Sequence, residues 1–230
     1  MDTHFFWKLY IFLGILVQLS IAALSDFDLL VFAQQWPKST CIKSRKPPSQ
    51  CILPRNDDWT IHGIWPTKSG QRGPESCRAD LPFRAQEVQS IRSRLLIQWL
   101  NVLNNNPVRF WKHEWEKHGT CSVDLADLNT QLKYFSKALE WNNRYKIGSI
   151  LGIDRITPGK NYAIKDILTA LNQGLRESSQ VTCIKDAANK QYLHEVRICI
   201  DKNLKLISCR GHLAFETNCD SRTNVEYPSR

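Results

Sequence analysis

Three of the six histidines in this 230-residue chain lie in two short segments that are rich in aromatic residues. His62 belongs to residues 61–66, and His113 and His118 belong to residues 110–121. Imidazole titrates near neutral pH, so one histidine can accept a proton while a second one donates a proton. The paired histidines therefore predict acid–base chemistry.

The second segment is predicted to form a short helix that brings four polar side chains to one side. Each residue advances about 100° around the helix axis, so with His113 at 0° the side chains of Lys117, Glu114 and His118 lie at about 40°, 100° and 140°. Two imidazoles, a carboxylate and an ammonium group would then face the same way. Lys117 and His113 would supply positive charge for an oxyanion, which suits phosphoryl transfer without a metal.

Two other interpretations of this segment stay open. Glu114 with His118, and His113 with Lys117, are equally consistent with i,i+4 pairs on a solvated face, which contribute roughly 0.2–0.5 kcal/mol each. A zinc site is the second alternative, because a His-Glu pair also occurs in metalloprotease helices. Those helices space their two histidines four residues apart, whereas these are five apart with a lysine between them. We therefore expect no metal.

RNA is the substrate that fits this chemistry. Its 2′-hydroxyl is an internal nucleophile, which one imidazole deprotonates while the other protonates the departing 5′-oxygen, leaving a 2′,3′-cyclic phosphate. The net charge of +9 suits a polyanion. Four aromatic residues near the histidines could stack on unpaired bases: Trp65, Phe110, Trp111 and Trp115. For most of the eight tryptophans, however, core packing is expected.

Apolar patterns outline the elements that must position these residues. Residues 27–33 are apolar at nearly every position, and residues 59–65 follow a similar pattern, which is typical of buried strands. Helical spacing of apolar residues over 84–103 and 125–139 predicts the core faces of two long helices.

Near the end of the chain, residues 192–200 and 204–209 flank a turn signal at 201–203. They predict a hairpin with Cys199 and Cys209 on opposing strands. Strands and helices that follow without regular alternation indicate an α+β fold, in one domain over residues 26–230. No Gly-rich phosphate loop follows a predicted strand, so no nucleotide or other cofactor is expected.

Residues 1–25 are predicted to be a secretory signal. An apolar stretch follows Lys8, and Ala23 and Ser25 occupy the −3 and −1 positions of a cleavage site. A membrane anchor is the alternative, but the stretch is shorter than the roughly 20 residues of a spanning helix. The mature chain would have no membrane segment and would be secreted to the extracellular space. It would keep all eight cysteines, which form disulfides in that compartment.

The segments 61–66 and 110–121 resemble the two active-site signatures of the ribonuclease T2 family, and among its branches they look most similar to the plant S-RNases. The resemblance continues at residues 27–37 and at the cysteine-bearing hairpin. It implies a metal-independent endoribonuclease that converts single-stranded RNA to 2′,3′-cyclic phosphate and then to 3′-phosphate ends. It also implies a single domain with a central, mainly antiparallel sheet, flanking helices and stapling disulfides.

The resemblance implies a role for individual residues. His62 would be the general acid, His118 the general base and His113 a phosphate ligand. Glu114 with Lys117 would stabilise the pentacovalent phosphorane. Four further positions would contact RNA: Gln35, Asn101, Val102 and Phe110. The remaining histidines of the mature chain, His194 and His212, match no motif and are interpreted as structural or surface residues.

The hairpin alone indicates one disulfide, Cys199 to Cys209. The family pattern implies the other three: Cys41 to Cys51, Cys77 to Cys121, and Cys183 to Cys219.

Charge distinguishes two branches of the family. S-RNases, which reject self-pollen in styles, are typically basic, whereas S-like enzymes of defence and phosphate scavenging are typically acidic. The sequence pI of about 9.2 favours an S-RNase, which implies a pollen F-box protein as a partner; we also expect a monomer. Residues 38–55, which hold five basic side chains and no acidic one, and the polar residues 68–80 are either recognition surfaces or solvated loops. A catalytically inactive storage or recognition protein is the competing function. The chain has no Asn-X-Ser/Thr sequon, so no N-linked sugar is assumed.

Overall fold

The computed structural model describes residues 26–229, so the predicted signal at residues 1–25 lies outside the described residues. The strands are β1 (Leu29–Gln35), β2 (Thr60–Thr67), β3 (Lys160–Tyr162), β4 (Gln180–Lys185), β5 (Gln191–Asp201), β6 (Leu206–Ile207) and β7 (Val225–Tyr227). The α-helices are α1 (Pro37–Lys43), α2 (Arg92–Gln98), α3 (Pro107–Lys117), α4 (Gln131–Arg144), α5 (Ile147–Ile153) and α6 (Ile164–Leu175). Short 3-10 helices are η1 (Pro48–Gln50), η2 (Ala85–Ile91) and η3 (Gly119–Cys121).

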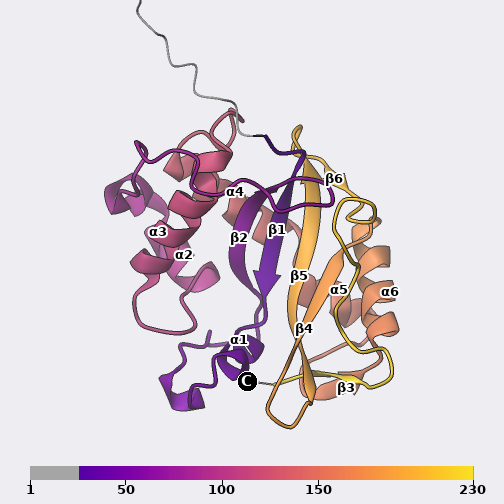
Figure 1. Cartoon of the computed structure of the whole chain (residues 1–230). Helices are drawn as coiled ribbons and strands as arrows, with labels where there is room; N and C mark the ends of the chain where they lie inside the picture. The colour runs from indigo at the N-terminus through magenta and orange to yellow at the C-terminus, as the bar shows by residue number, and fades with distance from the viewer. Residues whose placement is uncertain (1–25, 230) are drawn as a thin grey trace, which may run out of the picture.

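The strand β1 lies inside a seven-stranded sheet and is buried along its whole length. The strand order is β2-β1-β5-β7-β3, and β4 and β6 also pair with β5 (Figure 1). β1 pairs antiparallel with both β2 and β5, whereas β5 and β7 run parallel. The predicted α+β fold with a mainly antiparallel sheet is therefore confirmed.

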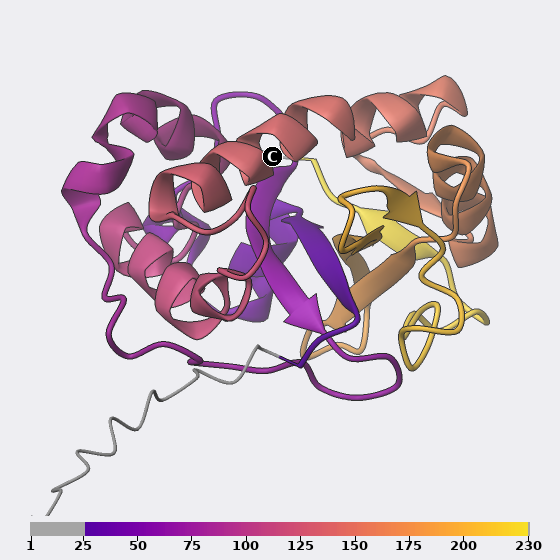
Figure 2. The ribbon, with the colours of Figure 1, turned by 90° about the horizontal axis from the view of Figure 1, so that it is seen from above.

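Helices cover one face of this sheet, as the view from above shows (Figure 2). Across that face, the Trp141 ring of α4 lies 5.6 Å from the Phe32 ring of β1. Both side chains belong to the main hydrophobic core. No helix within residues 26–229 combines the length and the apolar character needed to cross a bilayer.

The ladder between β1 and β2 contains a β-bulge at His62. Ala33 pairs with Gly63, and the next residue, Gln34, pairs with Ile61, so His62 is the extra residue of β2. A bulge bends its strand and re-aims the side chains beside it. The candidate general acid therefore lies at an irregularity of the sheet.

A second bulge lies on the other side of β1, in the ladder between β4 and β5. Thr182 pairs with Glu195 and Cys183 pairs with Leu193, which leaves His194 as the extra residue of β5. The two histidine bulges thus occur in the two strands that flank β1.

The prediction of one long helix over residues 84–103 is wrong. The segment divides into η2 and α2, and Trp99 leaves the helix with φ −131° and ψ 51°. Its apolar side chains are still buried as expected, including Val88, Leu95 and Trp99. Apolar spacing misjudged the length because a 3-10 turn places residues i and i+3 on one side nearly as an α-helix does.

The helix predicted over residues 125–139 begins later, at Gln131. The Thr130 side chain caps it by accepting a hydrogen bond from the Lys133 backbone N–H, and Leu128 is buried in the turns before it. In the predicted hairpin, the first strand is confirmed as β5, but the second is reduced to the two residues of β6.

All eight cysteines form disulfides, in the four pairs that the resemblance implied: Cys41–Cys51, Cys77–Cys121, Cys183–Cys219 and Cys199–Cys209. The second bridge joins residues 44 positions apart and ties the segment after β2 to η3, directly after α3.

We predict that removing this bridge affects both stability and catalysis. In the double variant Cys77→Ala/Cys121→Ala, loss of the 44-residue loop constraint should lower the free energy of unfolding by about 4 kcal/mol in the chain-entropy model. The rate of the RNA cleavage that the resemblance implies should also fall, because the end of α3 loses its tether. The matched control Cys199→Ala/Cys209→Ala, with a separation of 10, should lose about 3 kcal/mol but keep most of its rate. Denaturant unfolding and RNA cleavage measure both; equal rate losses would contradict the prediction.

Candidate active site

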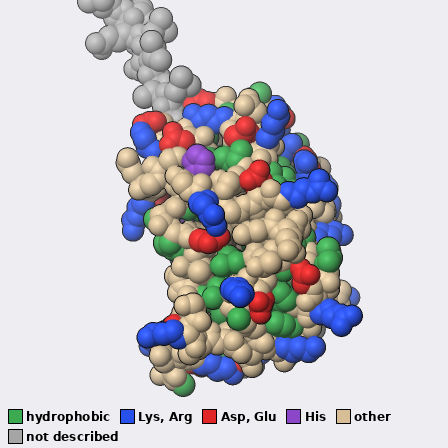
Figure 3. Space-filling model, turned by 90° about the vertical axis from the view of Figure 1, so that its right-hand side faces the viewer, with side chains coloured by type: hydrophobic (Ala, Val, Ile, Leu, Met, Phe, Trp, Pro, Cys, Tyr) green, Lys and Arg blue, Asp and Glu red, His purple; other side chains and the backbone are tan. Residues whose placement is uncertain are grey.

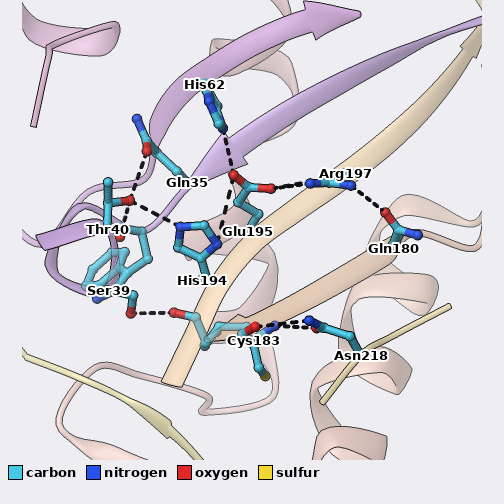
Figure 4. A network of polar contacts seen from close by, with 12 residues as sticks. Gln35, Ser39, Thr40, His62, Gln180, Cys183, His194, Glu195, Arg197 and Asn218 are labelled. Atoms are coloured by element: carbon cyan, nitrogen blue, oxygen red, sulfur yellow. Dashed lines mark hydrogen bonds and ion pairs between the residues drawn. The ribbon is translucent and has the colours of Figure 1, made fainter. Parts of the chain in front are cut away.

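The imidazole of His62 is held by a carboxylate that comes from another strand. Its Nδ1 lies 2.6 Å from Oε1 of Glu195 on β5 (Figure 4). The Glu195 side chain is 2% exposed, whereas that of His62 is 31% exposed. The ring is therefore anchored from inside the protein and remains accessible from outside.

The helix α3 carries the other candidate catalytic side chains. It begins with Pro107 after an N-cap by Asn106, whose side chain accepts from the Arg109 backbone N–H. Trp111 and Trp115 are buried and fix one side of the helix in the core. They have the packing role that was expected for most of the tryptophans, so they offer no stacking surface to a base.

The helix ends at Lys117, and His118 is its C-cap residue. The predicted helix is thus confirmed, but the last histidine lies just beyond it. The ring centroids of His118 and His113 are 6.3 Å apart. The side chain of Lys117 forms an ion pair with Glu75, with 3.4 Å between Nζ and Oε1.

Glu114 of the second segment, residues 110–121, is buried, with 1% of the residue exposed. Its Oε2 accepts a hydrogen bond from the indole N–H of Trp65, at 3.0 Å. This close approach requires Gly63, because a Cβ there would lie 2.1 Å from that Oε2 and 2.4 Å from the indole nitrogen. The glycine of the first motif is thus explained by the glutamate of the second.

The two catalytic histidine candidates contact the same indole ring. The Trp65 ring centroid is 4.9 Å from that of His62 and 5.7 Å from that of His118. The guanidinium carbon of Arg197 lies 5.2 Å from the Trp65 centroid, which is a cation–π contact. Trp65 therefore connects the histidine of β2 with the histidine after α3.

The environment of the two histidines shifts their pKa values in opposite directions. For His62, burial lowers the pKa, but the charge and hydrogen bond of Glu195 outweigh burial and raise the pKa above its ordinary value. Burial lowers the pKa of His118 to about 3, and Lys117 and the neighbouring imidazoles act in the same direction. The first imidazole therefore holds its proton more strongly than an ordinary histidine does, and the second is neutral at neutral pH.

Two further groups on α3 have perturbed pKa values. Burial raises the pKa of the Glu114 carboxyl to about 7, against the opposing effects of His62 and the Trp65 hydrogen bond. Partial burial and then the positive charge of Lys117 lower the pKa of His113. A carboxyl with a pKa near 7 can both donate and accept hydrogen bonds at physiological pH.

A cleft of about 660 Å³ opens beside the histidines. All four positions implied to contact RNA line it, together with His62 and His113: Gln35, Asn101, Val102 and Phe110. Val102 is only 2% exposed because its side chain packs beside Leu100. The Phe110 ring lies 5.9 Å from that of His62, between centroids.

Glu195 and Arg197 are site residues that the sequence interpretation missed. They alternate with apolar residues in a predicted strand, so both project from the same face of β5. An acidic residue inside a strand that is otherwise apolar is a signal for a buried, paired charge. His194, interpreted as structural or surface, is buried on β5, and its ring lies 3.5 Å from the Thr40 hydroxyl.

Three side chains of the site have donor atoms close enough together to hold one metal ion. The donor atoms of His113, Glu114 and His118 lie within 4.8 Å of one another. The charge of Lys117 acts on both histidines and disfavours a bound cation. The donor set therefore fits an anion between imidazoles and an ammonium better than it fits a cation.

Comparison with known proteins agrees with this architecture. A model of the ribonuclease T2 family matches residues 27–209. Ribonuclease Oy of Magallana gigas is 34% identical over 210 residues, which cover 88% of this chain and 97% of that protein. The solved structure of RNase NT in complex with 5′-AMP has a TM-score of 0.76 at 30% identity, over 88% of this chain and 98% of that one.

These matches, together with the fold, define the class of protein. The chain belongs to the ribonuclease T2 family, and it is an endoribonuclease of that type. A self-incompatibility associated ribonuclease of Nicotiana alata has a TM-score of 0.70 at 23% identity, over 89% of this chain and 100% of that one. That identity shows a shared fold alone.

We predict that Gly63→Ala selectively damages catalysis. The added Cβ would force the Glu114 carboxylate and the Trp65 indole apart, so the rate of RNA cleavage should fall by at least about tenfold. Gly152→Ala on α5 is the matched control, because a Cβ there meets nothing within 4 Å. Its rate should equal that of the unmodified enzyme. Steady-state kinetics with circular dichroism as a folding check would test this, and a fully active Gly63→Ala enzyme would contradict it.

Proposed function

We propose that this enzyme cleaves single-stranded RNA by transphosphorylation, with His62 as the general acid and His118 as the general base. The observation that carries this proposal is the pair of imidazoles around Trp65 whose pKa values are shifted in opposite directions. One imidazole holds a proton and the other lacks one at the same pH, which is what a concerted acid–base step needs.

In the first step, neutral His118 removes the proton of the 2′-hydroxyl, whose oxygen attacks the adjacent phosphorus. Protonated His62 gives its proton to the 5′-oxygen as the P–O5′ bond breaks, which leaves a 2′,3′-cyclic phosphate and a free 5′-hydroxyl. In the second step the roles reverse. His62 removes a proton from water, and His118 protonates the departing 2′-oxygen, which yields a 3′-phosphate.

Glu114 and Lys117 would stabilise the pentacovalent phosphorane between these steps. The ammonium of Lys117 offsets the charge on the phosphoryl oxygens. Glu114, with a pKa of about 7, spends part of its time as a neutral acid that can donate a hydrogen bond to a phosphoryl oxygen. His113, which is exposed beside His118, would bind the phosphate.

The cleft beside the histidines would hold a base of the RNA. The Phe110 ring offers a stacking surface, and the Gln35 amide offers a hydrogen bond to a base edge. Asn101 would shape the cleft wall, because its NH₂ group already donates to Asn104 Oδ1 and to the Asn106 backbone carbonyl. The Gln35 carbonyl oxygen already accepts a hydrogen bond from the Thr40 hydroxyl at 2.8 Å. That contact leaves the Gln35 NH₂ group free to face a base acceptor.

The proposed biological role is that of a secreted style S-RNase in gametophytic self-incompatibility. The sequence pI of about 9.2 and the four disulfides support a basic, secreted enzyme. Lys and Arg side chains are spread over the face shown in Figure 3, with Asp and Glu among them. Positive and negative side chains are therefore mixed on that face. A pollen F-box partner would bind at residues 38–55 or 68–80.

The chemistry is tested by incubating the oxidised mature protein with RNA in excess EDTA. We expect 2′,3′-cyclic ends, with a cleavage rate that falls at alkaline pH as His62 loses its proton. His62→Ala and His118→Ala should each reduce the rate by at least about 100-fold, whereas His212→Ala, at a histidine that contacts Ser69, should not. Dependence on added metal, or active His62→Ala and His118→Ala enzymes, would overturn the mechanism.

The biological role is tested separately in plant tissue. An S-RNase should accumulate in styles and should arrest pollen tubes that carry the matching allele, and the His118→Ala protein should not arrest them. Accumulation in other tissues during phosphate starvation would instead support the S-like role. RNA cleavage would remain valid in either case.

A further inference from the structure

A buried carboxylate lies behind the histidine that we assign as the general acid. Glu195 hydrogen-bonds to two residues, one through each oxygen, and the His194 Nδ1 also lies 3.9 Å from its Oε1 (Figure 4). Oε1 accepts from Nδ1 of His62 at 2.6 Å. Oε2 accepts from Arg197 twice, at 3.1 Å from Nε and 2.7 Å from Nη2. Both carboxylate oxygens therefore accept hydrogen bonds from groups that can carry positive charge, which offsets the free-energy cost of burying the ionised carboxylate.

The arginine that holds Glu195 is itself held in place. Its Nη1 donates to Oε1 of Gln180 at 3.0 Å, and the Gln180 amide in turn donates to the Phe215 backbone carbonyl at 2.6 Å. The guanidinium also lies over the Trp65 ring. A rotation of either Arg197 or Glu195 would break several contacts. The carboxylate therefore has a fixed position relative to the imidazole.

The sheet register explains how the two side chains reach each other across β1. Glu195 pairs with Gln35 and Arg197 pairs with Ala33, so all four side chains project from one face. Ala33 also pairs with Gly63 on the opposite edge. The small Ala33 side chain leaves room for the contact across β1, and the bulge at His62 re-aims the His62 side chain. The absence of a side chain at Gly63 admits Glu114 and Trp65.

This contact determines which nitrogen of His62 faces the substrate. An ionised carboxylate only accepts hydrogen bonds, so Nδ1 must carry a hydrogen. The second, exchangeable proton of the imidazolium therefore resides on Nε2. That is the nitrogen available to the leaving oxygen of the RNA.

The charges around His62 come from β5, from α3 and from the residue that caps α3. Glu195 and Glu114 favour the protonated ring, whereas the positive groups and neighbouring imidazoles oppose it: Arg197, His194, His113 and His118. Burial lowers the pKa of His62, and the Glu195 carboxylate raises it past that effect. Burial raises the pKa of Glu195, but the His62 charge and hydrogen bond lower it well below its usual range.

We propose that Glu195 is a positioning residue of the ribonuclease reaction, which fixes the orientation and tautomer of His62 and retains the proton on Nε2 for delivery to the 5′-oxygen. This inference rests on the proposed role of His62 as the general acid. Arg197 and Gln180 support it by holding the carboxylate ionised and immobile. The same arrangement serves the second step, in which the carboxylate stabilises the imidazolium that forms when His62 takes a proton from water.

The variant Glu195→Gln tests this proposal, because it keeps the size of the side chain and removes its charge. We expect kcat on a dinucleotide to fall by about tenfold or more, with KM nearly unchanged. The alkaline limb of the pH profile should move to lower pH, because His62 loses its proton more easily. Glu216→Gln is the matched control, since it breaks an exposed carboxylate–arginine pair with Arg210 at 3.3 Å and should leave both quantities unchanged.

A second substrate separates loss of the general acid from general damage. A uridine 3′-phosphate ester of 4-nitrophenol has a leaving group that departs without protonation. Glu195→Gln and His62→Ala should both cleave it at close to the normal rate while remaining slow on the dinucleotide. Equal losses of Glu195→Gln on both substrates would indicate damage to the fold and would overturn the proposal.

The titration of His62, followed by NMR of its ring nitrogens in the absence of RNA, provides a readout that is independent of activity. In the unmodified enzyme Nδ1 should stay protonated through the titration, and in Glu195→Gln the midpoint should move to lower pH. If Glu195→Gln folds poorly, Glu195→Asp, which retains the charge, should keep the alkaline limb in place. An unchanged Glu195→Gln profile together with an inactive His62→Ala enzyme would overturn this inference alone. A fully active His62→Ala enzyme would instead overturn the proposed function.

Discussion

The organisation of this molecule depends on the burial of β1. All seven of its residues are buried, so both edges of the strand must be paired to satisfy its backbone polar groups. β2 takes one edge and β5 takes the other, both antiparallel. One face of these three strands packs against helices and forms the main core. The opposite face is where a polar layer can form, and His62, Gln35 and Glu195 meet there.

The two histidines of this polar region have different surroundings. His62 lies on a bulge and faces a buried carboxylate, whereas His118 lies at the end of α3 among positive groups. Trp65 connects the two environments, since its ring contacts both imidazoles and its N–H binds Glu114. The packing of Trp111 and Trp115 fixes α3 against the core, and the bridge to Cys121 ties the segment just after it. Rigid elements thus support each candidate acid–base group.

Local patterns predicted much of the architecture. A short helix was predicted within segment 110–121, where α3 covers residues 107–117, and β5 followed from its apolar run. The helix over 84–103 was predicted too long, because the spacing of buried side chains does not distinguish an α-helix from a 3-10 turn followed by a short helix. Glu195 was missed for a different reason. It belongs to no local motif, and its partner His62 is 133 residues away in the chain.

Residue types and short-range spacing were sufficient to indicate acid–base chemistry on RNA, because imidazoles, a carboxylate and an ammonium group in two compact segments have that chemistry wherever they fold together. The pairing of the cysteines required the family pattern, and the structure reproduces it. The resemblance assigned the acid and the base, but the opposite shifts of the two histidines' pKa values follow only from the tertiary structure. The pKa of each imidazole depends on its burial and on charges that strand register and bulges bring close to it. These charges come from residues far apart in the chain, so local sequence patterns do not reveal them.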